Sequence, residues 1–195
     1  ERNGWIPPKH AKDHVPRVGS EEAIPESLHL AIRSFILAIA TRKARRDPLR
    51  HNSMLVHVTR FTAVQSRVTD AVHAALSDFR ARLRFGDKLA WRELEQLWLE
   101  DFVPTTMRLH NRGVAQDCRT VAWSEVRDHV VPAAESIKVN TINGQEADVL
   151  NYVDREETGL NVIAIGGDKL SRGLTLEGLD DATALASSGR WSVNS

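Results

Sequence analysis

The sequence predicts an α/β fold in which a mostly parallel sheet is flanked by helices, with an extra helical insertion after the first strand. Two observations lead to this prediction. Short apolar or β-branched runs at residues 53–59, 137–142 and 161–165 are typical of strands, and the last run is continuous, as in buried parallel strands. Helical segments separate these runs, which implies crossover connections between parallel strands.

The first helix is expected directly after Pro25. Residues 1–25 contain four of the chain's seven prolines, so this part should be an irregular lead-in. Ser27 is a candidate N-cap, and apolar residues then recur at helical spacing. The helix should end before Pro48, in a basic cluster that comprises Arg42, Lys43, Arg45 and Arg46. Two interpretations of this cluster remain open, a solvated helix end and a phosphate-binding group.

The helical insertion is expected at about residues 62–112. A long amphipathic helix over 62–84 should follow the first strand, with Gly86 as its break. A second helix over 88–101 should be closed by Pro104. Arg80, Arg82 and Arg84 alternate by two and therefore fan around the first of these helices, without forming one patch.

The second half of the chain continues the α/β pattern. A short helix is predicted over 123–130, stopped near Pro132, and is followed by the strand over 137–142. Asn143-Gly144 is a turn signal. A helix over 148–157 should then precede the last strand over 161–165.

Composition excludes several classes of protein. The 195 residues are 42% hydrophobic and 27% charged, which is typical of a soluble globular domain and not of a disordered or fibrous chain. The single cysteine, Cys118, excludes an internal disulfide. No apolar run approaches the roughly 18 to 20 residues that span a bilayer. We therefore expect a cytoplasmic protein.

The net charge of zero conceals an asymmetry. Residues 1–112 contain 19 basic and 13 acidic side chains, whereas residues 113–195 contain 7 basic and 13 acidic ones. The zero sum argues against coating of nucleic acid by bulk electrostatics. The basic first half leaves room for a local nucleic-acid track, although two solvated surfaces of opposite sign would produce the same count.

The segment 161–179, NVIAIGGDKLSRGLTLEGL, carries the strongest chemical signal. A buried strand runs directly into Gly166 and Gly167, and ligands bind at the carboxyl ends of strands in open α/β sheets. Glycines allow close approach of backbone to a ligand, and Lys169 and Arg172 can neutralise phosphate. The alternative is a tight turn with surface charges. A GxxxxGK[ST] phosphate loop is absent from the chain.

This segment closely resembles the signature of the Z1 domain family, described as candidate endonucleases associated with superfamily 2 helicase-like ATPases. The segments HNSMLVHVTRF at 51–61, GWIPPKH near the N-terminus and ESLHLAIRSFILA also resemble that family, so the likeness covers most of residues 4–179. The resemblance implies that 26–179 is the second RecA-like lobe of a helicase-like, ATP-dependent DNA-processing protein. A role in restriction or phage defence would follow.

The resemblance also implies site residues. Residues 171–175 fall on a helicase motif that contacts nucleotide and nucleic-acid backbone, so Ser171, Arg172 and Thr175 join Lys169 as phosphate or nucleic-acid contacts, and Gly173 joins Gly166 and Gly167 in shaping the loop. Thr175 stands where helicases usually have Asp. The strand MLVHVTR corresponds to the opening motif of that lobe. By that likeness, the residues near a DNA track are His57, Thr59 and Arg60.

Two departures from the family limit this inference. The Walker A loop and its acidic magnesium partner belong to a first lobe, so ATP and magnesium are expected only in an intact parent protein with an N-terminal ATPase lobe. Residues 180–195 depart from the family pattern, and only Gly189, Arg190 and Trp191 echo it. We read them as a divergent or foreign tail and assign Arg190 no role.

The residues themselves do not indicate nuclease chemistry. Glu135 and Lys138 are spaced one residue too widely for an ExK pair, and His10 and His14 lack a third ligand, so no metal site is predicted. The sequence therefore predicts a DNA-contacting part of an ATP-dependent machine. The alternatives are a non-enzymatic docking domain for a partner lobe and a metal-dependent nuclease with an unrecognised site.

Overall fold

The computed structural model describes residues 5–7, 9–47, 51–114, 119–142 and 159–167. Its described part is an α/β fold with a three-stranded parallel sheet, as the sequence predicts. The strands β1 (Asn52–His57), β2 (Ile137–Ile142) and β3 (Asn161–Gly166) are arranged in the order β1-β3-β2. The predicted helix over 148–157 and the tail over 180–195 lie outside the described residues.

The central strand, β3, is buried along its whole length because it pairs with a strand on either side. Its residues alternate between two apolar clusters. Ile163 and Ile165 belong to the main core, whereas Val162 and Ala164 belong to a second cluster on the opposite face. A strand buried on both faces explains the continuous apolar run in the sequence.

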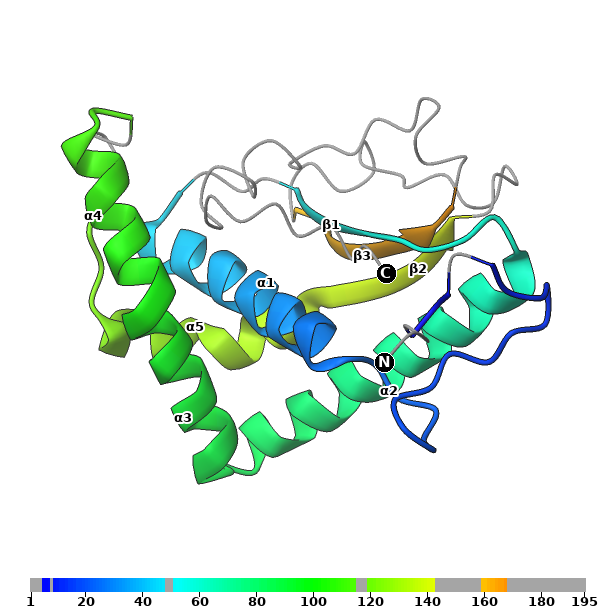
Figure 1. The fold of residues 1–195 in the computed structure, drawn as a ribbon. Coiled ribbons are helices and arrows are strands. Elements are labelled where there is room, and N and C mark those ends of the chain that lie inside the picture. Colours follow the sequence, from blue (N-terminus) through cyan, green and yellow to red (C-terminus); the bar gives the residue numbers. More distant parts are fainter. Residues whose placement is uncertain (1–4, 8, 48–50, 115–118, 143–158, 168–195) are drawn as a thin grey trace.

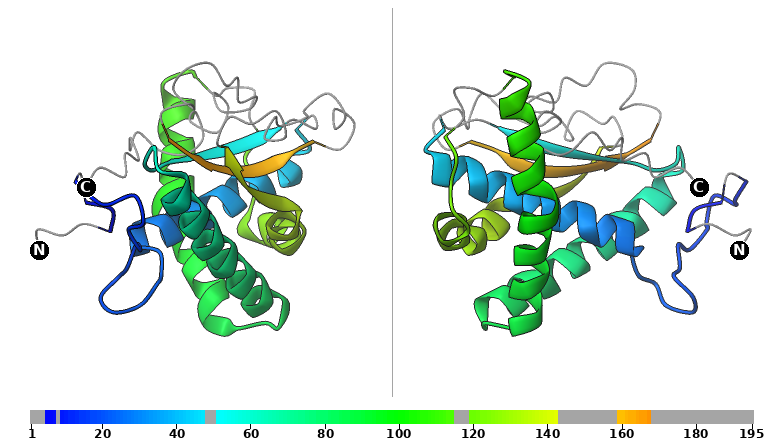
Figure 2. Two further views of the ribbon diagram at one scale, coloured as in Figure 1. Left: turned by 90° about the vertical axis from the view of Figure 1, so that its right-hand side faces the viewer. Right: turned by 60° about the vertical axis from the view of Figure 1, so that its left-hand side comes forward.

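Helices cover the face of the sheet that carries the main core (Figures 1 and 2). They are α1 (Glu26–Arg45), α2 (Thr62–Arg84) and α5 (Trp123–Ser136). α1 packs along α5, while α2 packs against β2, β3 and α5. Buried apolar residues of α2 recur at Val64, Val68, Val72 and Leu76, which is the predicted stripe.

The first helix starts where predicted, but its cap differs. Pro25 is the N-cap and offers no side-chain hydrogen bond, so Ser27 lies within the first turn. Pro25 suits the start of a helix because it has no N–H to satisfy and its φ is already restricted.

The helix after Gly86 does not stop at Pro104, contrary to the prediction. α3 (Lys88–Leu97) continues through a π-helical turn, η1 (Trp98–Phe102), into α4 (Val103–Asn111). The backbone N–H of Val103 bonds the carbonyl of Trp98, five residues earlier. The widened turn accommodates Pro104, whose ring would otherwise clash with the carbonyl four residues before it.

A second proline prediction is also wrong. α5 runs through Pro132 to Ser136, although the sequence predicts a stop near this residue. Pro132 is exposed, while Val130, Ala133 and Ala134 are almost completely buried against the core. Packing of this apolar face offsets the cost of a proline in a helix interior, about 3 kcal/mol.

Polar side chains link the amino-terminal ends of β1 and β3 to α1 and to the end of α5. Asn52 donates from Nδ2 to Oδ1 of Asn161 at 2.6 Å, and Asn161 donates from Nδ2 to Oγ of Ser136 at 2.7 Å. Arg42 of α1 donates to Oδ1 of Asn52 at 2.8 Å. These bonds join α1, β1, β3 and the end of α5, so they fix where the sheet starts relative to the helices.

Candidate functional site

The predicted site residues divide between described and undescribed parts of the chain. His57, Thr59, Arg60, Gly166 and Gly167 are described. The residues Lys169, Ser171, Arg172, Gly173 and Thr175 lie outside the described residues.

The described part of the site lies at the carboxyl end of the sheet. His57 pairs with Gly166 at the last register position of β1 and β3. The backbone N–H of Val58 then donates to the carbonyl of Gly166 at 2.9 Å. Because the two strands are parallel and end together, the residues that follow β1 lie beside Gly167, and β1 leads from there into the start of α2 (Figure 1).

Gly167 is in close contact with the segment after β1. A Cβ added to Gly167 would overlap the carbonyl oxygen of Thr59 and lie 2.7 Å from its carbonyl carbon. It would also lie 2.9 Å from Nε2 of Gln65. Backbone atoms cannot move aside as the end of a flexible side chain can, so this position requires glycine. The need for glycine at position 167 therefore has a specific physical cause, the approach of two backbones, while the predicted shaping of the loop that follows stays a prediction.

Gln65 holds this contact in place, although the sequence reading does not single it out. Its Nε2 donates to the carbonyl of Thr59 at 2.6 Å, and its side chain is buried in the first turn of α2. Its Oε1 is buried and has no hydrogen-bond partner. The available signal was a polar residue beside Val64 on the buried side of a predicted helix, where burial requires a partner.

His57 and Arg60 are exposed, whereas Thr59 is buried. The Arg60 guanidinium lies 5.2 Å from the centre of the Phe61 ring, so a cation-π contact holds it at the start of α2. Phe61 is the N-cap of this 23-residue helix and makes no side-chain cap, and the first turn carries no acidic residue. The positive end of the helix dipole therefore adds to the charge of Arg60.

The irregular lead-in packs against this end of the sheet, which the sequence did not indicate. His10 contacts Oγ1 of Thr59 through Nε2 at 3.0 Å and the carbonyl of Pro7 through Nδ1 at 2.6 Å. The His10 ring also meets Phe61 edge-on, with centroids 5.5 Å apart. The hydroxyl of Thr59 is thus engaged within the chain.

Arg67 fastens the lead-in to α2. Its Nη1 donates to the carbonyls of Asp13 and His14, the latter at 2.9 Å. His14 in turn contacts the carbonyl of Trp5 through Nε2 at 3.1 Å. Both histidines of the lead-in, His10 and His14, thus contact oxygen atoms of the chain.

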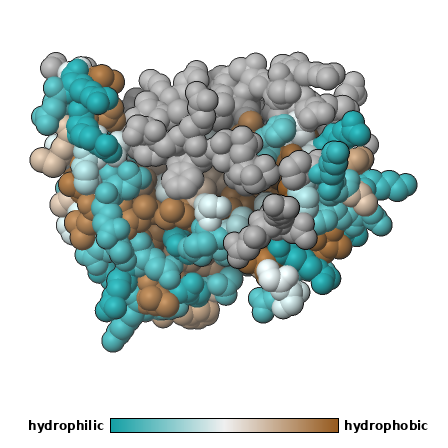
Figure 3. All heavy atoms as spheres, viewed as in Figure 1, coloured by the Kyte–Doolittle hydropathy of each residue, from teal (hydrophilic) through white to brown (hydrophobic). Residues whose placement is uncertain are grey.

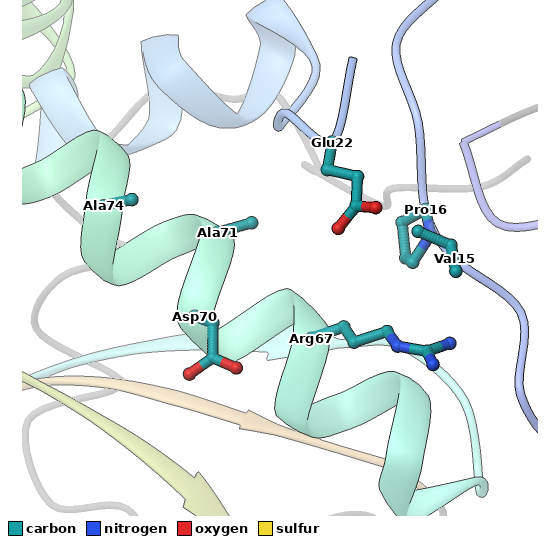
Figure 4. Close-up of a pocket in the computed structure, with 7 residues that line it drawn as sticks. All are labelled: Val15, Pro16, Glu22, Arg67, Asp70, Ala71 and Ala74. Atoms are coloured by element: carbon teal, nitrogen blue, oxygen red, sulfur yellow. The ribbon is translucent and has the colours of Figure 1, made fainter. Parts of the chain in front are cut away.

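A pocket of about 250 Å³ lies between the lead-in and α2 (Figure 4). Its lining residues are Val15, Pro16, Glu22, Arg67, Asp70, Ala71 and Ala74. Glu22 pairs with Arg17 at 3.4 Å, and Arg67 is engaged by the backbone of the lead-in. Two of the three charged groups around this pocket therefore have partners within the chain.

A family model decides the relationship of this chain to known proteins. The model of the Z1 domain matches residues 27–182, which includes every described strand and helix except the start of α1 and also the segment after β3. The chain belongs to the Z1 domain family. No curated protein and no solved structure matches it.

In this Z1 domain, the match places β1, the start of α2 and β3 within the family's own region. Among the residues that the structure describes, no group of three or more His, Cys, Asp or Glu side chains could hold a metal ion. Within the same residues, no helix has the length and apolarity needed to cross a membrane.

Proposed function

We propose that this Z1 domain contacts the phosphate backbone of DNA at the carboxyl end of its sheet, as part of a helicase-like, ATP-dependent DNA-processing protein. The observation that supports this most directly is the close contact between Gly167 and Thr59. It brings the residues after β1 against Gly167, the residue that follows β3. Surfaces at the carboxyl ends of parallel strands are where α/β proteins bind ligands.

The charge of this surface suits phosphate. Arg60 and His57 are exposed there, beside the start of α2. In the sequence, Lys169, Ser171 and Arg172 follow Gly167 within five residues, and Thr175 follows it by eight. Arginine forms two-pronged hydrogen bonds to phosphate, and helix N-termini attract anions. These features support binding to the backbone and do not imply a particular base sequence.

ATP and magnesium belong to the intact parent in this proposal, bound by a separate N-terminal lobe. ATP would supply the energy for movement on DNA. This chain lacks the GxxxxGK[ST] loop, so its own residues would contribute DNA contacts and contacts between lobes.

DNA binding at low salt tests the proposal. Fluorescence anisotropy with labelled single- and double-stranded DNA should detect binding, and Arg60→Ala and Arg172→Ala should each weaken it and reduce the salt slope by about one. The matched control is Arg84→Ala, at the far end of α2, where Arg84 pairs with Glu135 at 2.5 Å. Unchanged affinity and salt slope in both site variants would contradict the proposal.

A docking role for a partner lobe is a second candidate, because apolar side chains are exposed along α3 and α4. Leu89, Leu99 and Met107 are each more than half exposed, and Figure 3 shows apolar patches that interrupt the hydrophilic surface on this side. If docking is the function, Leu99→Glu with Met107→Glu should abolish complex formation with a partner lobe, measured by light scattering after gel filtration. Arg60→Ala should leave that complex intact.

A further inference from the structure

The arginines at the end of α1 are not a solvated helix end. Arg42 and Arg45 are only 8% and 7% exposed. Burial of a guanidinium is costly unless hydrogen bonds or opposite charges compensate it. Arg42 has such a role, because it bonds Asn52 in the polar network at the start of the strands. Arg45 requires a separate explanation.

Arg45 and Arg119 each donate a hydrogen bond to a backbone carbonyl of the other's segment. Arg45 donates from Nε to the carbonyl of Arg119 at 3.0 Å, and Arg119 donates from Nη2 to the carbonyl of Ala44 at 3.4 Å. These reciprocal bonds place two cationic side chains at the same junction, between the end of α1 and the segment before α5. A junction that carries two positive charges attracts an anion.

One nitrogen of this arrangement has no acceptor. Nη1 of Arg45 is buried and makes no hydrogen bond. A buried donor without an acceptor typically costs about 1–3 kcal/mol, and more when it is charged. Capping of the α1 C-terminus explains the bonds to the two carbonyls, since cations suit that end of the helix dipole, but it does not explain the unpaired Nη1.

Carboxylates near the cluster do not balance it. Glu125 bonds Arg119 through one oxygen, while its other oxygen accepts from the N–H of Ala122 at 3.2 Å. The pKa of Glu125 is lowered first by that backbone hydrogen bond and then by the charges of Arg119 and Arg46. In the sequence, the run 42–47 adds one acidic residue, Asp47, to four basic ones: Arg42, Lys43, Arg45 and Arg46.

Arg46 follows the last residue of α1, and its backbone caps the end of that helix. It ends α1 in the left-handed conformation, with φ of 60°, and its N–H bonds the carbonyls of Arg42 and Lys43. Its side chain is exposed and takes part in no ion pair of the described residues. The charges of Arg46 and Arg119 both lower the pKa of Glu125, so these two side chains lie near the same carboxylate.

We propose that Arg45, Arg46 and Arg119 form a second anion site, which takes a phosphate group. Planar guanidinium groups match the geometry of phosphate oxygens, and three of them can surround one tetrahedral anion. The site lies at the end of α1, on the opposite side of the molecule from the start of α2 (Figure 1). It is independent of the DNA surface proposed above, because none of its residues belongs to that surface.

Thermal unfolding of the whole 195-residue chain tests the site. Orthophosphate should raise the melting temperature above that in sodium chloride of equal ionic strength, since a ligand that binds only the folded state stabilises it. The increase should be lost in the double variant with Arg46→Ala and Arg119→Ala, both at exposed positions. It should persist in Arg84→Ala, which removes an exposed arginine paired with Glu135.

A second variant addresses the buried nitrogen itself. Arg45→Lys keeps the positive charge but removes the planar guanidinium group. It should therefore reduce the phosphate-specific increase in melting temperature, while circular dichroism shows that the chain remains folded. The proposal is overturned if orthophosphate has no effect beyond ionic strength, or if the double variant responds as the unmodified chain does.

Two further measurements distinguish the source of the phosphate. A single-stranded oligonucleotide that competes with orthophosphate, and binds more weakly to the double variant, identifies a nucleic-acid backbone. Binding of orthophosphate without such competition identifies a free phosphate group. Arg60→Ala and Arg172→Ala should leave the orthophosphate effect unchanged, so failure of this site and failure of the DNA surface can be told apart.

Discussion

The two ends of the sheet are built in opposite ways. At the carboxyl end, the absence of a side chain at Gly167 lets two backbones meet, and hydrogen bonds of His10 and Gln65 hold the residues after β1 in place. At the amino end and the nearby end of α1, long charged side chains and asparagines cross between elements. The close approach of two backbones limits substitutions at the carboxyl end. The need of buried polar groups for hydrogen-bond partners limits them at the amino end.

Because the two ends of the sheet are built differently, they should tolerate different substitutions. Substitution at the carboxyl end should act through steric overlap, which salt does not screen. Substitution at the amino end should act through unpaired polar groups, and the loss should depend on whether the partner is also removed. The following predictions test that contrast, from the largest expected effect to the smallest.

Gly167→Ala should have the largest effect, because its Cβ would overlap the backbone of Thr59. We expect a loss of about 1–3 kcal/mol in the free energy of unfolding, as for other overpacked positions, or several degrees in melting temperature. Urea unfolding measures it. Gly19→Ala is the matched control, since Gly19 has φ of +65° in open space and its substitution should cost only backbone strain, about 1 kcal/mol. Equal losses at the two glycines would contradict the role of backbone contact.

Asn161→Leu should cost about 1–3 kcal/mol at the opposite end, because it removes the acceptor of the Asn52 Nδ2 bond inside the protein. The double variant Asn52→Leu with Asn161→Leu should be less destabilised than the sum of the single variants, because the two polar groups are removed together. Additive losses in this cycle, measured by urea unfolding, would show that the two asparagines do not act as a unit.

His10→Ala should cost about 1 kcal/mol by removing the contact with Thr59, a typical net value for one hydrogen bond. It should also increase cleavage of residues 5–25 by a protease under native conditions, because this contact helps to fasten the lead-in. Lys12→Ala, at an exposed position of the same lead-in, is the control. Equal cleavage in both variants would argue against a fastening role for His10.

His29 should produce the smallest effect, one that depends on pH. Burial is the main cause that lowers its pKa from the ordinary value of 6.5, and Arg33 adds to it, while Glu26, Glu93 and Asp78 act in the opposite direction. Between the folded pKa and 6.5 the unfolded chain binds more protons, so this residue's contribution to stability is lost as pH falls below about 6.5. His29→Gln should flatten the fall of unfolding free energy between pH 7.5 and pH 5.5. An unchanged slope would contradict the assignment.

Much of the fold could be predicted from local patterns. The long amphipathic helix over 62–84 and the continuous apolar run at 161–165 have strong periodic signals, and both elements form as expected. The two wrong helix ends both involve proline. Pro104 and Pro132 are tolerated because a π-turn relieves one and core packing offsets the other, and neither compensation is visible in a local pattern.

The candidate site was harder to predict for a related reason. Gly166 and Gly167 could be recognised from the sequence, because an apolar strand that runs into Gly-Gly is a local signal. Gln65, His10 and the unpaired Nη1 of Arg45 could not, since their roles depend on contacts between residues 6 to 74 positions apart. Sequence spacing does not report such contacts.

The local pattern of residues was enough to predict an α/β fold with a parallel sheet, the succession of most strands and helices along the chain and the likeness to the Z1 domain family, because periodicity and motifs are properties of neighbouring residues. The order of the strands within the sheet, β1-β3-β2, follows only from the tertiary structure. Only the tertiary structure decided which polar groups are buried. Folding brought the end of α1 against the segment before α5, and so converted a run of basic residues into a cluster with a guanidinium nitrogen that lacks an acceptor. Burial sets the free energy of a charge, and burial is a property of the packed molecule.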